Sequence, residues 1–301
     1  GTVESTSGGF KFPDGTTQTT AASGGVSASS ANTFTREQTV DGTQDGVQLK
    51  VQGHSTQTSN VVEVEQSDGT DLLTLNNTGK VSIGGTDGLV ATGTFGSGTL
   101  PATGAGTRLM WYPKKAAFRA GNVTGTQWDD ASIGDYSTVA GGQDNRASGN
   151  AGTVGGGVSN IASGIHSTVA GGNGSTASGN KSTIGGGNGN TASSTFSTVA
   201  GGNGNAASGN AGTVGGGENN TASNSQSAVG GGENNTANGQ WATVPGGHLN
   251  TAAGSYSFAA GRRAKANHNG AFVWGDQTDA DFASTAVNQF LIRASGGVGI
   301  N

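Results

Sequence analysis

Between Ser137 and Ala260 the apolar positions recur every fifteen residues. Each unit carries one mostly β-branched residue and, eight positions later, an alanine, with glycine, serine and asparagine between them. The first rank is Val139, Val154, Val169, Ile184, Val199, Val214, Val229, Val244 and Ala259, and the second is Ala147, Ala162, Ala177, Ala192, Ala207, Ala222, Ala237 and Ala252. A fixed period this short predicts a solenoid with one coil per repeat.

A coil of this length has room for two short strands and two turns, with glycine and asparagine at the turns. Side chains of a strand alternate between its two faces. Val139 and Ala147 therefore face the interior, whereas Thr138, Arg146 and Ser148 face outward. The sequence predicts an all-β chain whose interior holds one valine and one alanine per coil.

Such a core is thin, because it contributes about 2–3 kcal/mol per coil against about 1–2 kcal/mol of backbone entropy for each ordered residue. Either neighbouring chains supply further contacts, or ladders of stacked side chains do. One asparagine rank is suited to such a ladder. It comprises Asn145, Asn160, Asn190, Asn205, Asn220, Asn235 and Asn250, and it is broken only by Ser175. Because paired glycines allow close backbone approach, we expect a homotrimer or a similar symmetric fibre.

The units from Ser137 to Asn150 and from Ser197 to Asn210 read SxV(A/G)GG followed by NxASGN. They resemble the head repeats of the YadA-like trimeric autotransporter adhesins and related repeats of phage tail fibres. The resemblance implies a homotrimer containing a left-handed parallel β-roll. The family's usual unit is shorter and has an Ala-Ile/Leu-Gly core, so this glycine-rich version departs from it. We expect the β-roll head to span residues 137–265.

Residues 46–106 alternate short apolar runs with turns and end in a Gly/Thr-rich stretch. Strands are expected at 47–51, 61–65, 72–75 and 80–83, because these runs have period two and are separated by Asp-Gly and Asn-Thr-Gly turns. Isolated hairpins are marginal in water. The segment resembles the trimeric β-prism shafts of phage tail fibres, which implies that three copies wrap around one another.

The remaining segments flank the shaft and the roll. Residues 1–45 contain FPDGTTQ, which is similar to the opening of fibre-type surface proteins and implies attachment to a fibre base or anchoring protein; a solvent-exposed hairpin is the alternative. Residues 107–136 concentrate bulky side chains and are expected to cap the roll; a binding site is the alternative. Residues 266–301 are expected to close it, and NQFLIRASGGVGIN is similar to the junction before a C-terminal chaperone segment of tail fibres.

Composition argues against several classes of function. The 301 residues carry a net charge of −5 with only 11% charged residues, which provides no basic surface for nucleic acid or anionic membrane. There is no cysteine, no apolar run long enough to span a membrane, and no secretory signal at the first residues. His54, His166, His248 and His268 lack ligand spacing, and Asp129 and Asp130 fit an end cap better than a carboxylate pair for glycoside hydrolysis. We expect no metal, no cofactor and no enzymatic activity.

Two sets of exposed positions are candidate binding sites. The residue three positions before each core valine varies widely along the repeats, and its aromatic members, Phe196, Trp241 and Tyr256, are candidates for contact with a receptor or glycan. The residue directly before the valines is nearly always threonine. This threonine rank comprises Thr138, Thr153, Thr168, Thr183, Thr198, Thr213 and Thr243, and it would form a flat array of the kind that ice-binding solenoids present.

The sequence favours a non-enzymatic, extracellular trimeric fibre or adhesin, on a virion tail fibre or a bacterial surface, that attaches to a host cell or surface receptor. Its affinity would come from several copies binding together. An ice-binding β-solenoid that uses the threonine rank is one alternative, and a purely structural spacer or filament subunit is another.

Overall fold

The computed structural model describes residues 4–6, 9–11, 17–18, 61–65, 71–84 and 89–299. They belong to two compact units, residues 1–89 and residues 90–301. The strand expected at 47–51 and the Pro13-Asp14-Gly15 turn lie outside the described residues.

The first unit contains short antiparallel strands. β1 (Glu4–Thr6), β2 (Gly9–Lys11) and β3 (Thr17–Gln18) form one sheet, and β4 (Val62–Glu65), β5 (Asp71–Leu75) and β6 (Val81–Ile83) form another. In the turn between β5 and β6, the Asn76 side-chain oxygen accepts hydrogen bonds from the backbone N–H groups of Thr78 and Lys80. The strands expected near 61–65, 72–75 and 80–83 are confirmed.

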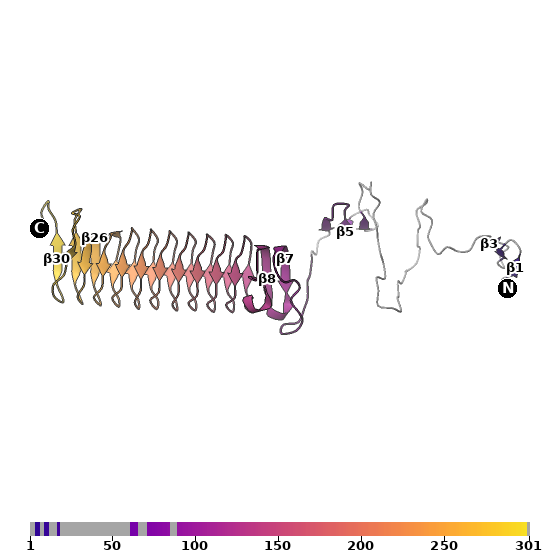
Figure 1. Ribbon diagram of the computed structural model, residues 1–301, viewed down its shortest axis with the longest axis horizontal. Coiled ribbons are helices and arrows are strands. Elements are labelled where there is room, and N and C mark those ends of the chain that lie inside the picture. Colours follow the sequence, from indigo (N-terminus) through magenta and orange to yellow (C-terminus); the bar gives the residue numbers. More distant parts are fainter. Residues whose placement is uncertain are drawn as a thin grey trace. The chain divides into compact units, whose positions relative to one another are not determined.

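The second unit begins with an antiparallel pair and continues as a parallel β-solenoid of about ten turns (Figure 1). The pair consists of β7 (Gly106–Tyr112) and β8 (Ala117–Val123), which are joined by the 3-10 turn η1 (Pro113–Lys115). A second 3-10 turn, η2 (Asp130–Ser132), precedes the first coil. β8 pairs in parallel with the first strand of the solenoid, so the pair extends the stack.

Two parallel sheets form the walls of the solenoid. The valine sheet contains β9 (Thr138–Val139), β11 (Thr153–Val154), β13 (Thr168–Val169), β15 (Thr183–Ile184), β17 (Thr198–Val199), β19 (Thr213–Val214), β21 (Ala228–Val229), β23 (Thr243–Val244), β26 (Phe258–Arg262), β28 (Phe272–Gly275) and β30 (Phe290–Arg293). The short strand β24 (Gly247–His248) also pairs with β26. The alanine sheet contains β10 (Arg146–Ala147), β12 (Ile161–Ala162), β14 (Thr176–Ala177), β16 (Thr191–Ala192), β18 (Ala206–Ala207), β20 (Thr221–Ala222), β22 (Thr236–Ala237), β25 (Thr251–Ala252), β27 (Ala264–Ala266) and β29 (Phe282–Ala283).

The pairing register follows the sequence period. Val139 lies beside Val154 in the valine sheet, and Ala147 lies beside Ala162 in the alanine sheet. In each coil, one residue located between the two strands also forms a single parallel bridge with the equivalent residue of the next coil. This ladder of bridges runs from Gln143 to His248. The predicted parallel solenoid with fifteen-residue coils is therefore confirmed.

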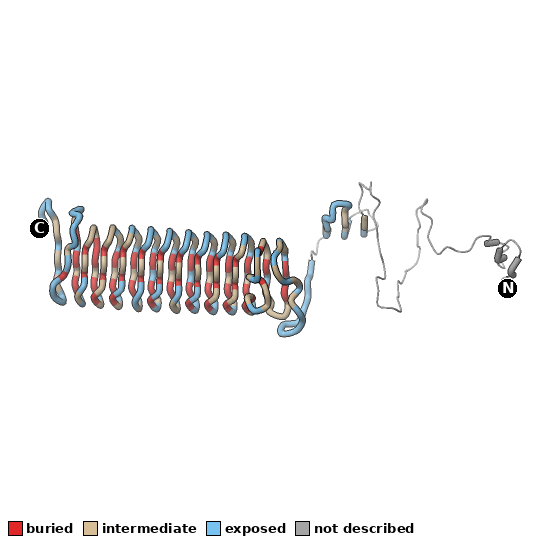
Figure 2. The backbone as a smooth tube through the Cα atoms, in the orientation of Figure 1, coloured by how far each residue is buried: buried red, intermediate tan, exposed pale blue. Residues whose placement is uncertain are grey.

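The core is closed within a single chain. The core valines and alanines of the repeat are at most 1% exposed, and the buried residues lie inside the stack along its length (Figure 2). The asparagine rank is buried beside them. The sequence suggested that so thin a core needs either contacts from neighbouring chains or ladders of stacked side chains. The structure contains such ladders within one chain.

The buried asparagines join consecutive coils through the backbone. The Asn205 side-chain amide donates to the carbonyl oxygens of Gly201 in its own coil and Gly217 in the next, while its side-chain oxygen accepts from the N–H of Asn220. The hydrogen bonds run along the axis as expected, but each amide bonds to backbone and not to the next amide. Buried polar groups of this kind are stable only when they have partners, so the rank stabilises the turn as well as the stack.

The N-terminal end of the solenoid is covered by Arg119 and Trp128. Arg119 pairs with Val139, so its guanidinium lies over the end of the core, where it donates to the carbonyl oxygens of Ser137 and Ala147. Burial lowers the pKa of Arg119 to about 10. The Trp128 indole N–H donates to the Asn145 carbonyl oxygen across 3.0 Å. These side chains shield from water an end that stacking leaves open.

At the C-terminal end the period breaks while the sheets continue. Gly247 pairs with Gly261 and Gly261 with Gly275, at intervals of fourteen residues, whereas Gly275 pairs with Arg293. The extra residues between β28 and β30 include the loop 276–281. Phe258, Phe272 and Phe290 stack face to face with centroids 4.7 Å apart, in the row that the threonines occupy in earlier coils.

Candidate binding surfaces

The variable position of each repeat lies at an exposed corner with left-handed backbone. We call this set the variable corner. Its members have φ values between 51° and 58° although none is glycine, namely Tyr136, Ala151, His166, Lys181, Phe196, Ala211, Gln226, Trp241 and Tyr256. The Phe196 N–H donates to the Asn180 carbonyl oxygen of the preceding coil. Backbone hydrogen bonding holds the corner in place, so its side chain is free to vary.

The structure brings together two of the three predicted aromatic residues. The Trp241 and Tyr256 rings stack with centroids 4.7 Å apart and an interplanar angle of 14°. Phe196 lies three coils earlier, where the Lys181 ammonium group is 5.0 Å from its ring centroid. Trp241 and Tyr256 thus form one continuous aromatic surface, and Phe196 lies apart from it.

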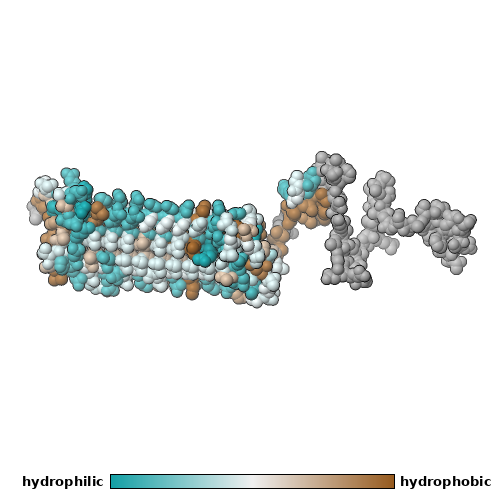
Figure 3. Space-filling view, viewed as in Figure 1, coloured by the Kyte–Doolittle hydropathy of each residue, from teal (hydrophilic) through white to brown (hydrophobic). Residues whose placement is uncertain are grey.

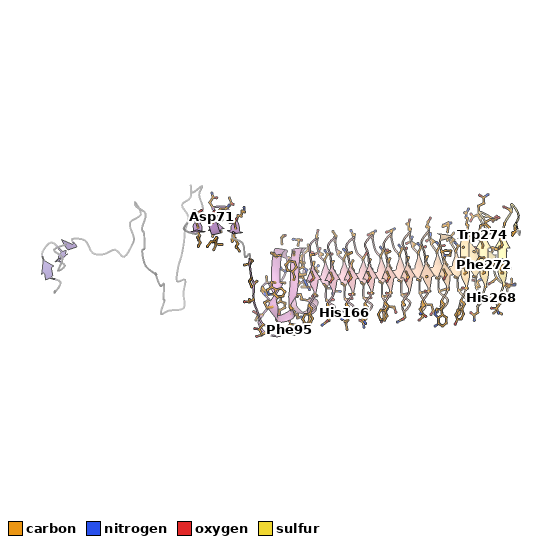
Figure 4. All side chains as sticks on the ribbon, turned by 180° about the vertical axis from the view of Figure 1, so that it is seen from behind. Asp71, Phe95, His166, His268, Phe272 and Trp274 are labelled. Atoms are coloured by element: carbon orange, nitrogen blue, oxygen red, sulfur yellow. The ribbon has the colours of Figure 1, made fainter. Side chains whose placement is uncertain are left out.

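The same edge carries another stacked pair at the N-terminal end. Phe95 stacks on Tyr136 with centroids 5.0 Å apart, and Figure 4 shows Phe95 and His166 along one long edge of the solenoid. This edge therefore presents aromatic pairs near both ends, and between them Phe196 is the one phenyl ring among smaller and polar side chains.

The predicted threonine rank is confirmed as one straight row. Pairing places Thr138 beside Thr153, and the row continues along the outer face of the valine sheet to Thr213, where Ala228 interrupts it before Thr243. Sequence reasoning missed a second row on the alanine sheet, comprising Thr176, Thr191, Thr221, Thr236 and Thr251. This row could have been found in the sequence, because the residue directly before the core alanine is threonine in these five repeats. Figure 3 shows pale rows of near-neutral hydropathy along the middle of the visible face of the solenoid, hydrophilic teal side chains along its upper edge and at its C-terminal end, and few brown patches.

A further concave surface, which the sequence did not predict, lies where the period breaks. We call it the C-terminal groove. It is an open cavity of about 720 Å³, lined by Gly247, His248, Gly261, Arg262, Trp274, Gly275, Asp276, Gln277 and residues 294–297. Trp274 projects from the outer face of β28 and is 38% exposed. In Figure 4, Trp274 lies away from the edge that carries His166 and His268.

Ion pairs fix the loop that borders this groove. Arg293 Nε is 3.1 Å from Asp276 Oδ1, and Arg262 Nη2 is 2.9 Å from Asp279 Oδ1. Hydrogen bonds from Thr278 and from the Ser295 backbone hold the pKa of Asp276 well below its usual range. The carboxylate is therefore ionised near neutral pH and holds residues 293–295 against the loop.

The two aspartates considered in the sequence, Asp129 and Asp130, have structural partners, whereas His54 lies outside the described residues. Asp130 accepts a hydrogen bond from the Tyr112 hydroxyl across 2.8 Å and pairs with Lys115, while Asp129 accepts from the Gly104 N–H. Burial, followed by the bond to Asp130, raises the pKa of Tyr112 to about 12. Asp129 and Asp130 thus hold the N-terminal end together and face different partners.

Within the residues that the structure describes, there is no group of three or more His, Cys, Asp or Glu side chains that could hold a metal ion. No helix in this part of the chain is both long and apolar enough to cross a membrane.

A comparison of the chain with models of known protein families and with curated proteins finds no match. Any assignment of function therefore rests on the sequence pattern and on the geometry of these surfaces.

Proposed function

We propose that this chain is a subunit of a non-enzymatic, homotrimeric extracellular fibre that attaches to a receptor or glycan on a cell surface. In this proposal the roll is left-handed, as the resemblance to YadA-like heads implies, and residues 46–106 belong to a trimeric shaft. The fibre is part of a virion tail or of a bacterial surface, and its N-terminal segment binds the fibre base or an anchoring protein.

The variable corner is the observation that supports attachment most strongly. The scaffold beneath it repeats the same backbone hydrogen bonds in every coil, whereas the side chain at the corner changes from alanine to lysine, histidine or tryptophan. Exposed aromatic side chains supply large contact areas at low entropic cost. The stacked Trp241 and Tyr256 rings are the part of this edge best suited to bind a receptor.

A row of glycines supports self-association. Gly141, Gly156, Gly171, Gly186, Gly201, Gly216 and Gly231 occupy one outward position per coil, and a Cβ added at any of them would meet nothing within 4 Å. Five of these seven lack positive φ, so neither packing nor backbone conformation within the chain explains the glycine. Close approach of another chain would explain it.

Attachment can be tested by measuring adsorption of the fluorescently labelled chain to a panel of bacterial and animal cells. We expect saturable adsorption to at least one surface, and a loss of about tenfold or more in affinity when Trp241→Ala and Tyr256→Ala are combined. Gln226→Ala changes the same corner without removing an aromatic ring and serves as the matched control. Adsorption that is unaffected by the double substitution would contradict a role for this pair.

Ice binding is the second candidate function, because the threonine rank lines up along the outer face of the valine sheet and strands of a sheet are about 4.8 Å apart. The residues two positions further on along the valine sheet are alanine, glycine or proline, so that sheet carries a single threonine row. Measurement of thermal hysteresis, with Thr183→Tyr as the disrupting variant, tests this candidate. A purely structural spacer would show neither adsorption nor hysteresis.

A further inference from the structure

The C-terminal groove is open and has the volume of a ligand site. Its volume of about 720 Å³ lies within the range of small-molecule sites in proteins, about 300–1,000 Å³. It is made by successive coils in register, since Gly247 pairs with Gly261 and Gly261 with Gly275. These glycines line the groove with backbone, and they allow close approach of consecutive coils, because a Cβ on Gly247 or Gly261 would meet the carbonyl oxygen of the next glycine.

Trp274 provides an apolar wall beside these glycines. It pairs with Ala260 on one side and Ile292 on the other, so it stands next to a smaller neighbour with much of its indole exposed. A tryptophan ring in this setting offers both an apolar face and an N–H donor. Among the residues that the structure describes, neither the Trp274 indole N–H nor the His248 imidazole has a hydrogen-bond partner.

The charges of the groove are balanced within the protein. Asp276 pairs with Arg293, and Arg262 pairs with Asp279. The groove therefore has no unpaired carboxylate for a cationic ligand and no unpaired guanidinium for an anionic one. A ligand that fits this surface is uncharged, has an apolar ring face and carries hydroxyl groups around its rim.

We propose that the C-terminal groove binds two or three units of a neutral oligosaccharide, with one pyranose ring stacked on Trp274 and hydroxyls of the neighbouring units bonded to the indole N–H and to His248. The inference rests on the proposed attachment function and names the ligand class for it. The groove is separate from the variable corner, so the two surfaces act independently.

The test uses four probes: maltotriose, cellotriose and N-acetylated chitotriose as neutral sugars, and 3′-sialyllactose as the anionic comparator. Binding to the full chain is measured by saturation-transfer NMR and by titration calorimetry. We expect at least one neutral sugar to bind at millimolar or lower concentration and more tightly than sialyllactose. No binding by the neutral sugars, or tighter binding of sialyllactose, would overturn the proposal.

Two substitutions test whether the sugar binds in the groove. Trp274→Ala removes the stacking surface, and Gly296→Leu fills the groove from a position where an added Cβ meets nothing within 4 Å. Each is expected to weaken sugar binding about tenfold or more, the equivalent of one aromatic contact of about 1.4 kcal/mol. Gly299→Leu, which also enters open space but lies outside the lining residues, is the matched control and keeps wild-type affinity. Equal binding by all three variants would refute the assignment.

Cell adsorption of the same variants separates this proposal from the attachment function. If the wild-type chain adsorbs to cells but binds no neutral sugar, attachment stands and the groove assignment is wrong. If the wild-type chain adsorbs to no surface while a neutral sugar binds in a Trp274-dependent way, the groove assignment stands and the attachment function is wrong.

Discussion

The side-chain oxygen of Asn205 accepts a hydrogen bond from the backbone N–H of Asn220, fifteen residues later, across 2.9 Å. The same amide closes its own turn by donating to the Gly201 carbonyl oxygen. One buried side chain therefore fixes both the shape of a coil and its distance to the next. A solenoid with only two apolar side chains per coil depends on this arrangement for its stability.

We expect Asn205→Ala to lower the free energy of unfolding by about 2 kcal/mol or more. It leaves the buried N–H of Asn220 without a partner, at about 1–3 kcal/mol, and it removes the side-chain bonds to the partly buried carbonyl oxygens of Gly201 and Gly217, of which Gly217 keeps its bond from the Asn203 N–H. Asn205→Ser should be milder, since Ser175 occupies the same rank and accepts from the Asn190 N–H across 3.3 Å. Urea unfolding and amide hydrogen exchange measure the loss. The exposed Asn210→Ala is the control, and an equal effect of that variant would contradict the role of the ladder.

The left-handed corners predict a substitution that stabilises the protein. Ala211 has a φ of 51°, a conformation that costs a residue with a Cβ about 1 kcal/mol or more relative to glycine. We expect Ala211→Gly to raise the free energy of unfolding by about 0.5–1 kcal/mol after the added flexibility of the unfolded chain is included. Ala207→Gly, at a fully buried strand position, should destabilise. A lower thermal midpoint for Ala211→Gly would contradict this account of the corner.

The Asp276 carboxylate, which pairs with Arg293 and accepts from the Ser295 N–H, predicts a dependence of the C-terminal segment on acid pH. Because the folded-state pKa of Asp276 is depressed, its contribution is complete above the unfolded-state pKa of about 3.9 and is lost as the pH falls further. We expect the amide protection factors of residues 290–299, which correct for the intrinsic pH dependence of exchange, to fall below about pH 4 and to change little between pH 5 and 8. In Asp276→Asn the protection of this segment should already be low at pH 7 and should no longer respond to acid. Wild-type protection that is constant down to pH 2 would contradict a role for the Asp276–Arg293 ion pair.

The repeat region was predictable from sequence because its geometry is periodic. The spacing of Val139 and Val154 determines which residues lie side by side, and alternation determines that Thr138 faces outward. The partners of Asn205 were not predictable, because they depend on how the glycine turns fold back towards the core. The C-terminal groove was missed for a different reason: it forms where the period fails and the loop after Gly275 folds against Arg262, and no repeat pattern specifies that contact.

Alanine substitutions at the two neighbouring glycines of a turn are expected to have different effects, and the comparison tests self-association. Gly157 has a φ of +86°, and a Cβ on it would lie 2.1 Å from the Gly172 carbonyl oxygen, so Gly157→Ala should disrupt the coil. Gly156 has open space around it and no positive φ, so Gly156→Ala should leave a single chain as stable as the wild type. If the glycine row packs against another chain, however, a methyl group there would hold the chains apart.

Light scattering of the wild type and of Gly156→Ala distinguishes these cases. For the proposed homotrimer we expect a wild-type mass of three times the 29.2 kDa chain. Combining Gly156→Ala, Gly171→Ala and Gly201→Ala should lower this mass, or move dissociation to a lower denaturant concentration, while circular dichroism keeps the β signal. A monomeric wild-type chain would contradict the trimer directly. A trimer insensitive to all three substitutions would mean that its contacts lie on another face, and the glycine row would then remain exposed to solvent beside the threonine rank, which would favour the ice-binding candidate.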